Sequence, residues 1–137
     1  MVDKLPPEHR SENMRRIRSK DTKPEMLVRR LVHGMGFRYR LHGLDLPGKP
    51  DLVFTSRRKV IFVHGCFWHM HGDPRCSDRR EPQSNQEYWK PKLARNRQRD
   101  AEHLAALESA GWSVLTVWEC ETRDAAALAA SVRAFLN

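Results

Sequence analysis

The stretch that decides the fold is PDLVFTSRRKVIFVHGC, residues 50–66. Two apolar runs flank a short polar turn in it, and this pattern predicts a hairpin of two strands, Asp51–Phe54 and Arg58–Val63. Asp51 opens the first run, and His64 follows the second. On paired antiparallel strands both side chains would emerge at the same end of one sheet. A carboxylate and an imidazole placed together there suit a metal-dependent phosphodiesterase.

A helix is predicted just upstream of the hairpin. Thr22 is a suitable N-cap, Pro24 fits the first turn, and Glu25 would complete a capping box with Thr22. Apolar residues then recur at helical spacing until Gly34 and Gly36, which are expected to end the helix.

The remaining elements also follow from periodicity. The spacing predicts strands over residues 37–41 and 112–118 and helices over residues 85–110 and 124–136. Pro91 is expected to break or kink the longer helix. The residues of that helix expected to face inward are Leu93, His103, Leu104 and Leu107. The order α-β-β-β-α-β-α predicts an α/β fold with a central mixed sheet and helices on both faces.

The charge of the chain is strongly positive and uneven. Its 137 residues carry a formal net charge of +8. The basic residues gather in two clusters, one of Arg15, Arg16, Arg18, Lys20, Lys23, Arg29, Arg30, Arg38 and Arg40, the other of Arg79, Arg80, Lys90, Lys92, Arg95, Arg97 and Arg99. Such patches most often bind nucleic acid, because they neutralise phosphates and release counterions. A basic surface that only confers solubility is the alternative.

The sequence pattern gives no sign of membrane association. No stretch of 18 apolar residues occurs, and the first residues lack the apolar run of a signal peptide. We therefore expect a cytoplasmic protein. Residues 1–20 form a basic segment with little to bury, which could order only on a partner such as DNA. Residues 21–137 are expected to form a single domain.

Three cysteines and a histidine have the chemistry of a structural zinc site. Cys66, His71 and Cys76 lie at intervals of five residues in a loop, and Cys120 follows the last predicted strand. If that strand returns to the same end of the sheet, three thiolates and one imidazole would complete a tetrahedral set. Buried thiols without a metal are the alternative.

Asp51, His64 and His69 are the candidate catalytic residues. Asp51 stands at the mouth of an apolar strand, and Mg²⁺ prefers such hard oxygen ligands. The two histidines flank a turn at the start of the predicted zinc loop, where a neutral imidazole can activate water near pH 7. The alternatives are a solvated aspartate and ordinary histidines, and either histidine could bind zinc instead of His71.

Phe67 and Trp68 are adjacent large aromatic residues on a polar loop. Two functions suit them. They could cover the zinc site or the core. They could also insert between base pairs, which is easiest at a weakened pair.

In combination these motifs resemble the PD-(D/E)xK nuclease superfamily, with the usual acid and lysine of the second strand replaced by Phe62 and His64. That replacement, followed directly by GCFWH at residues 65–69, resembles the very short patch repair (Vsr) endonucleases. The resemblance covers about residues 10–121. It implies a restriction-endonuclease-like fold with a structural zinc ion.

The resemblance also implies a mechanism of DNA phosphodiester hydrolysis. Asp51, the backbone carbonyl of Val63 and the scissile phosphate would hold catalytic Mg²⁺. His69, oriented by Asp100, would deprotonate the attacking water, and His64 would assist near the phosphate. Glu25 would belong to the active site in addition to its capping role.

Further residues are assigned by the same resemblance. The implied zinc ligands are Cys66, His71, Cys76 and Cys120, with a spacing between the second and third that is longer than the family pattern. Phe67, Trp68 and Trp89 would intercalate beside a mismatch, and Met14 could insert from the other groove. Lys92 and Asn96 align with polar positions of the helix that carries Asp100.

The implied activity is a nick in one strand, 5′ to the T of a T:G mismatch, which arises by deamination of 5-methylcytosine. The partner would be mismatched double-stranded DNA in the bacterial nucleoid, with general mismatch-repair proteins as possible further partners. A monomer is expected, because a mismatch lacks two-fold symmetry. The alternatives are a restriction-linked nuclease of the same fold that ignores mismatches, and a zinc-stabilised DNA-binding module without catalysis.

Overall fold

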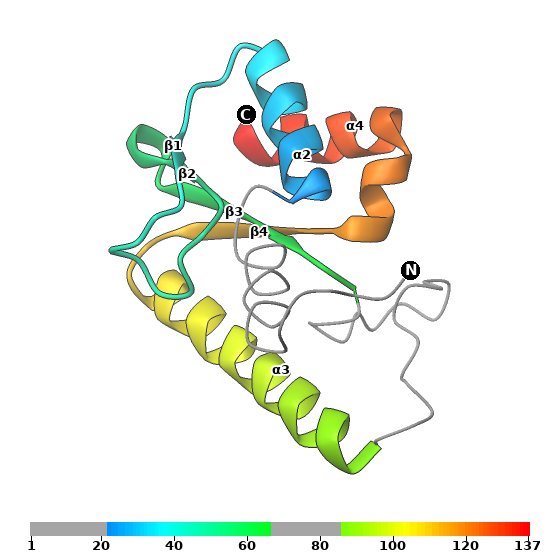
Figure 1. Ribbon diagram of the computed structural model, residues 1–137. Coiled ribbons are helices and arrows are strands. Elements are labelled where there is room, and N and C mark those ends of the chain that lie inside the picture. Colours follow the sequence, from blue (N-terminus) through cyan, green and yellow to red (C-terminus); the bar gives the residue numbers. More distant parts are fainter. Residues whose placement is uncertain (1–21, 67–85) are drawn as a thin grey trace, which may run out of the picture.

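A four-stranded sheet forms the centre of the computed structural model, which describes residues 22–66 and 86–137 (Figure 1). The strands are β1 (Arg40–Leu41), β2 (Leu52–Phe54), β3 (Lys59–His64) and β4 (Ser113–Trp118), in the spatial order β1-β2-β3-β4. β2 pairs antiparallel with β1 and β3, whereas β3 and β4 are parallel. The predicted mixed sheet and the predicted hairpin are therefore confirmed.

Helices cover both faces of this sheet, as predicted. The helices are α2 (Lys23–Gly34), α3 (Gln86–Ser109) and α4 (Ala125–Leu136), with short 3-10 turns η1 (Thr55–Arg57) and η3 (Glu119–Arg123). In Figure 1, α2 and α4 lie on one face and α3 lies on the other. α3 leads from the end of β3 to the start of β4, so it supplies the crossover that a parallel pair requires.

The core has two layers because strand side chains alternate between the two faces. The layer against α2 and α4 contains Val28, Val32, Leu52, Phe54, Ile61, Val117, Leu128, Val132 and Leu136. The layer against α3 contains Val53, Val60, Phe62 and Leu107. Full burial of one such side chain contributes roughly 1.5–3 kcal/mol. The hairpin is held from both sides, and its end is a rigid platform for functional groups.

Side chains cap the N-terminal ends of α2 and α4, and the cap at Thr22 is the one that the sequence predicted. The Thr22 hydroxyl accepts a hydrogen bond from the Glu25 N–H at 3.3 Å, and the Asp124 carboxylate accepts one from the Ala127 N–H at 3.1 Å. α2 ends at Gly34, and Gly36 then adopts a φ of 93°, which favours glycine. No helix in the described part of the chain is long and apolar enough to cross a membrane.

Three details differ from the sequence prediction. α3 runs unbroken through Pro91, which lies near its N-terminal end and removes a single N–H donor. Leu104 is 40% exposed, because only a narrow stripe of α3, including Leu93 and Leu107, faces the sheet. The strand expected over residues 37–41 is paired only at Arg40–Leu41, since its partner β2 is three residues long.

Candidate active site

Asp51 lies immediately before β2, at the end of the sheet where β3 finishes. Its Oδ2 accepts a hydrogen bond of 2.7 Å from the backbone N–H of Val63. This contact joins the start of one hairpin strand to the end of the other. The prediction that Asp51 would meet the end of the second strand is confirmed.

Glu25 brings a second carboxylate to the same place from α2. It is only 2% exposed, although it lies in the first turn of a helix. Its Oε2 contacts the guanidinium of Arg29 and lies 2.9 Å from Nε2 of His42. Glu25 therefore does more than support the helix terminus, because its carboxylate is directed at buried polar partners.

His42 is a residue of this site that the sequence analysis missed. It follows β1 and adopts a left-handed backbone conformation, with a φ of 48°. Its backbone N–H donates to the carbonyl of Asp51 at 3.0 Å, which extends the β1–β2 ladder by one residue. The signal was present in the sequence, because pairing residues 37–41 with the strand after Asp51 would have placed His42 opposite the aspartate.

A tight turn closes the loop that begins at His42. The N–H of Gly43 donates to the carbonyl of Pro50 at 2.9 Å. A Cβ atom on Gly43 would lie 2.8 Å from Cγ2 of Val53, which is too close for any other residue without movement. The turn therefore needs glycine here, and it fixes the distance between His42 and Asp51.

Together these residues form a group suited to a cation. One ligand atom from each of Glu25, His42 and Asp51 can be chosen so that all three lie within 4.8 Å of one another. Two carboxylates and one imidazole are ligands that divalent metals such as Mg²⁺ and Mn²⁺ accept, with the oxygens the better match for Mg²⁺. The donor set therefore fits the metal that a nuclease requires.

The electrostatics of Asp51 also favour a bound cation. The pKa of Asp51 is raised to about 7. Burial is the largest cause and the nearby carboxylate of Glu25 adds to it, while the Val63 N–H and the Arg29 guanidinium act in the opposite direction. Two carboxylates this close, one buried and one partly buried, repel each other when both are ionised. A proton or a metal ion that enters the site relieves this repulsion.

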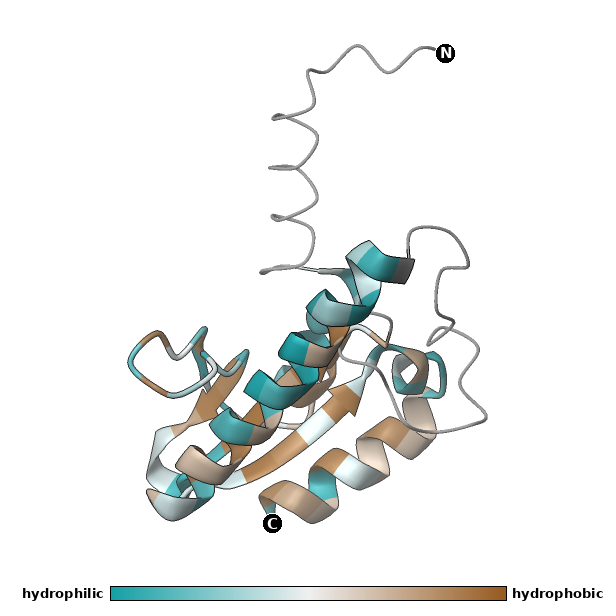
Figure 2. Ribbon diagram, turned by 90° about the horizontal axis from the view of Figure 1, so that it is seen from below, coloured by the Kyte–Doolittle hydropathy of each residue, from teal (hydrophilic) through white to brown (hydrophobic). Residues whose placement is uncertain are grey.

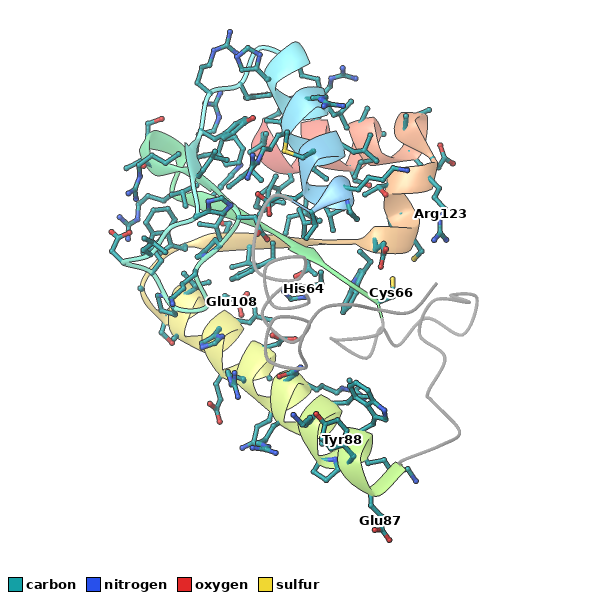
Figure 3. All side chains as sticks on the ribbon, in the orientation of Figure 1. His64, Cys66, Glu87, Tyr88, Glu108 and Arg123 are labelled. Carbon is teal, nitrogen blue, oxygen red and sulfur yellow. The ribbon has the colours of Figure 1, made fainter. Side chains whose placement is uncertain are left out.

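His64 closes β3 at the same end of the sheet, as predicted. Its ring centroid lies 5.4 Å from that of Phe62 and 5.3 Å from that of Trp118. Figure 3 shows the side chain directed to the side of the sheet on which α3 lies. Within the described residues, the group of three potential metal ligands does not include it. His64 therefore lies at the same end of the sheet as the carboxylates and does not belong to their group.

Cys66 and Cys120 follow the ends of two neighbouring parallel strands, β3 and β4. His64 pairs with Trp118 in the parallel β3–β4 ladder, and each cysteine follows two residues later. Cys66 is fully buried and Cys120 is partly buried. The last strand thus returns to the end of the sheet that the zinc prediction required. The other two predicted ligands, His71 and Cys76, lie outside the described residues.

α3 carries three residues that the resemblance assigned to the site or to DNA contact, of which Lys92 is exposed and Asn96 and Asp100 are partly buried. Figure 2 shows that its face away from the sheet is hydrophilic along its length. Lys92, Asn96 and Asp100 are spaced by four residues and so lie on one side of the helix. Lys92 stacks on the ring of Tyr88 at 4.5 Å, and Tyr88 packs edge-on against Trp89 at 5.0 Å.

Four other predicted site residues cannot be placed. Met14, Phe67, Trp68 and His69 lie outside the described residues. The orientation of His69 by Asp100 and the insertion of the aromatic pair therefore stay predictions.

A family model described as DNA mismatch endonuclease Vsr matches residues 2–75, more than half of the chain. The chain belongs to the Vsr family. It is 52% identical over 137 residues to the type II nicking enzyme V.XorIIP of Xanthomonas oryzae pv. oryzae, covering all of this chain and 98% of that protein. It is 42% identical over 114 residues to the DNA mismatch endonuclease Vsr of Escherichia coli, covering 83% of this chain and 71% of that protein.

A further relative has a similar name. The type II nicking enzyme V.NaeI of Lentzea aerocolonigenes is 45% identical over 118 residues, covering 82% of this chain and 68% of that protein. Membership of the Vsr family establishes the chain as a DNA endonuclease. The alternative of a DNA-binding module without catalysis is therefore the weaker interpretation.

Proposed function

We propose that this Vsr-family endonuclease nicks one strand of double-stranded DNA 5′ to the T of a T:G mismatch. The observation that carries the proposal is the pair of carboxylates at one end of the sheet, Glu25, which is buried, and Asp51, which is partly buried. A relative with 42% identity is named a DNA mismatch endonuclease, and several are named nicking enzymes.

The residues at this end of the sheet would have different roles in hydrolysis. Asp51 and Glu25 would hold the catalytic Mg²⁺ with the backbone carbonyl of Val63. When bound, Mg²⁺ would stabilise negative charge on the scissile phosphate. His69 would accept the proton of the attacking water, and His64, at the end of β3, would donate a hydrogen bond to the phosphate.

A structural zinc ion would hold the segment that follows β3. The proposed ligands are Cys66, His71, Cys76 and Cys120. The parallel pairing of β3 and β4 supports this set, because it brings the first and last ligand to the same end of the sheet. Four protein ligands fill a tetrahedral zinc ion, so the ion would stabilise the fold without taking part in hydrolysis.

The aromatic residues next to the zinc ligands would recognise the mismatch. Phe67, Trp68 and Trp89 would enter the base stack, with Met14 on the opposite groove. Unstacking costs a few kcal/mol and is least costly at a mispaired step. Lys92 and Asn96 would contact the DNA from α3. The exposed, basic face of α3 and the half-buried position of Trp89 support this arrangement.

The setting of the reaction follows from the substrate. Residues 21–137 would act as one domain and as a monomer, with residues 1–20 ordering on the DNA. A T:G mismatch forms where 5-methylcytosine is deaminated, so the enzyme would serve very short patch repair in the bacterial cytoplasm, beside general mismatch-repair proteins.

A nicking assay tests the proposal. Matched, T:G and C:A duplexes in several flanking sequences are incubated with Mg²⁺, and the cut strand is mapped. We expect a nick only in the T strand of T:G duplexes, and none with the Asp51→Asn variant. Equal cleavage of matched DNA would favour the restriction-linked nuclease and would contradict the repair function.

A double variant tests the source of mismatch recognition. Phe67→Ala with Trp68→Ala should reduce the preference for T:G over matched DNA. An unchanged preference would show that the aromatic pair only covers the core or the zinc site. Trp112, which packs under Arg58 far from the site, provides a matched aromatic control in the variant Trp112→Phe.

A further inference from the structure

We propose that His42 is a positioning residue of the nicking site, which holds the carboxylates of Glu25 and Asp51 at the separation that receives the metal ion. The inference rests on the proposed function, since it concerns the same site. His42 was not among the residues predicted from the sequence, and the structure alone brings it to the carboxylates.

The first observation is that His42 contacts both acidic residues. Its side-chain Nε2 lies 2.9 Å from Oε2 of Glu25, and its backbone N–H donates to the carbonyl of Asp51 at 3.0 Å. Glu25 and Asp51 come from different elements, α2 and the start of β2. His42 therefore contacts two residues of the site that come from different elements. Groups that hold metal ligands in this way typically fix both their distance and their orientation.

The second observation is the backbone conformation. His42 has a φ of 48°, a left-handed conformation that is uncommon outside glycine, although asparagine, aspartate and histidine adopt it more often than other residues. Such conformations persist where the surroundings impose them, and they gather at functional sites. Here the conformation lets one residue continue the ladder to Asp51 while its ring turns toward α2.

The third observation is the position of Arg29. Its guanidinium contacts Oε2 of Glu25 and lies 3.1 Å from Nε2 of His42. Both side chains are largely buried, at 12% and 23% exposure. Arg29 supplies the positive charge that offsets the two acids, and His42 sets the angle at which Glu25 is held. Arginine carries a permanent positive charge that its substitution would remove, so His42 is the residue chosen for the test.

Two substitutions separate the side chain of His42 from its backbone. Asn tolerates the left-handed conformation, so His42→Asn should fold, but its amide is too short to reach Oε2 of Glu25. The amide of Gln extends about as far as Nε2 of an imidazole, so His42→Gln should restore the contact. His33, an exposed histidine of α2, provides the control His33→Asn.

Mn²⁺ binding to the DNA-free protein is measured for these variants by the electron paramagnetic resonance signal of free Mn²⁺. Nicking of T:G duplexes is then measured against Mg²⁺ concentration. We expect His42→Asn to weaken Mn²⁺ binding about 10- to 100-fold, which is typical for loss of a group that orients a metal ligand. The Mg²⁺ concentration for half-maximal nicking should rise accordingly. His42→Gln and His33→Asn should stay within a few-fold of the wild type.

Different results would contradict the role of His42 and the nicking activity. A wild-type protein that nicks T:G DNA, with Mn²⁺ affinity unchanged in His42→Asn, would overturn the positioning role only. Equal loss in His42→Asn and His42→Gln, with lower melting temperatures in both, would overturn it too, because it would indicate a merely structural residue. A wild-type protein that nicks no T:G duplex but shows the expected Mn²⁺ differences would overturn the proposed function and support the positioning role.

Discussion

The two ends of the β2–β3 hairpin use charged residues in opposite ways. At the turn, the side chains of Arg57, Arg58 and Lys59 donate to the carbonyl oxygens of Leu136, Ala110 and Phe135, at 3.1, 2.7 and 2.6 Å. These carbonyls belong to the C-terminal ends of α3 and α4, where cations are favoured. Each of these three cations therefore has a carbonyl acceptor with partial negative charge.

At the other end, like charges are placed together. Glu25, which is buried, and Asp51, which is partly buried, lie at the same sheet end, and Arg29 offsets only part of their combined negative charge. The turn end therefore stabilises the folded chain, whereas the carboxylate end is stabilised fully only when a cation is bound. Incomplete compensation of two neighbouring carboxylates is a sign of a metal site, because it lowers the stability of the metal-free protein. A cluster that only stabilised the fold would have balanced charges.

The largest expected effect comes from neutralising Asp51. Asp51→Asn should reduce nicking of T:G DNA by roughly 10³-fold or more, because it removes a charged metal ligand worth several kcal/mol in the transition state. The same variant should be at least as stable as the wild type without metal, because a neutral amide removes the repulsion with Glu25. Rates and urea denaturation measure the two effects. A variant that loses both activity and stability would contradict the comparison.

The pH dependence of stability should reveal the same repulsion. The pKa of Asp51 is about 7 in the folded protein against an ordinary value of 3.8, so the folded state binds more protons between these values. The free energy of unfolding of the metal-free protein should therefore fall as pH rises from about 4 to about 7, by an amount on the order of a few kcal/mol. Urea denaturation across this range measures it, with Asp51→Asn as the control. A parallel decline in that variant would assign the effect to other groups.

The sequence predicted the site residues on the hairpin itself better than those that come from α2 and from the loop after β1. The positions of Asp51 and His64 could be predicted, because strand alternation and antiparallel pairing are local rules. Glu25 was assigned to the site through a family resemblance, whereas the N-cap of its helix, Thr22, was predicted from local sequence. Strand pairing could have placed the backbone of His42 opposite Asp51, but the side-chain contacts of His42 and Arg29 could not be predicted, because they depend on how α2 packs against the loop after β1.

The turn end should affect stability and leave catalysis unchanged. Lys59→Met should lower the free energy of unfolding by about 1 kcal/mol, because the carbonyl of Phe135 loses a charged donor at the end of α4. The melting temperature should fall by about 3 °C for a domain of this size. The nicking rate below that temperature should stay at the wild-type value. A changed rate with unchanged stability would contradict the separation of the two ends.

The smallest effect is expected from single basic residues on α3. Arg95 is exposed on this helix, and its substitution by Met should reduce the slope of log affinity against log salt by about 1, provided that it contacts a phosphate. Fluorescence anisotropy with an Asp51→Asn background keeps the DNA intact. Arg133→Met on α4, away from α3, provides the matched control. Equal slopes in all proteins would place the DNA elsewhere.

The most direct test of the carboxylate end is to locate the metal. Crystals of the protein, grown or soaked at a Mn²⁺ concentration that supports nicking, would show the ion by its anomalous scattering. The account predicts a peak within coordination distance of the Asp51 carboxylate, on the side of Glu25 and His42. Manganese bound only at other places, or no peak at this sheet end, would contradict it.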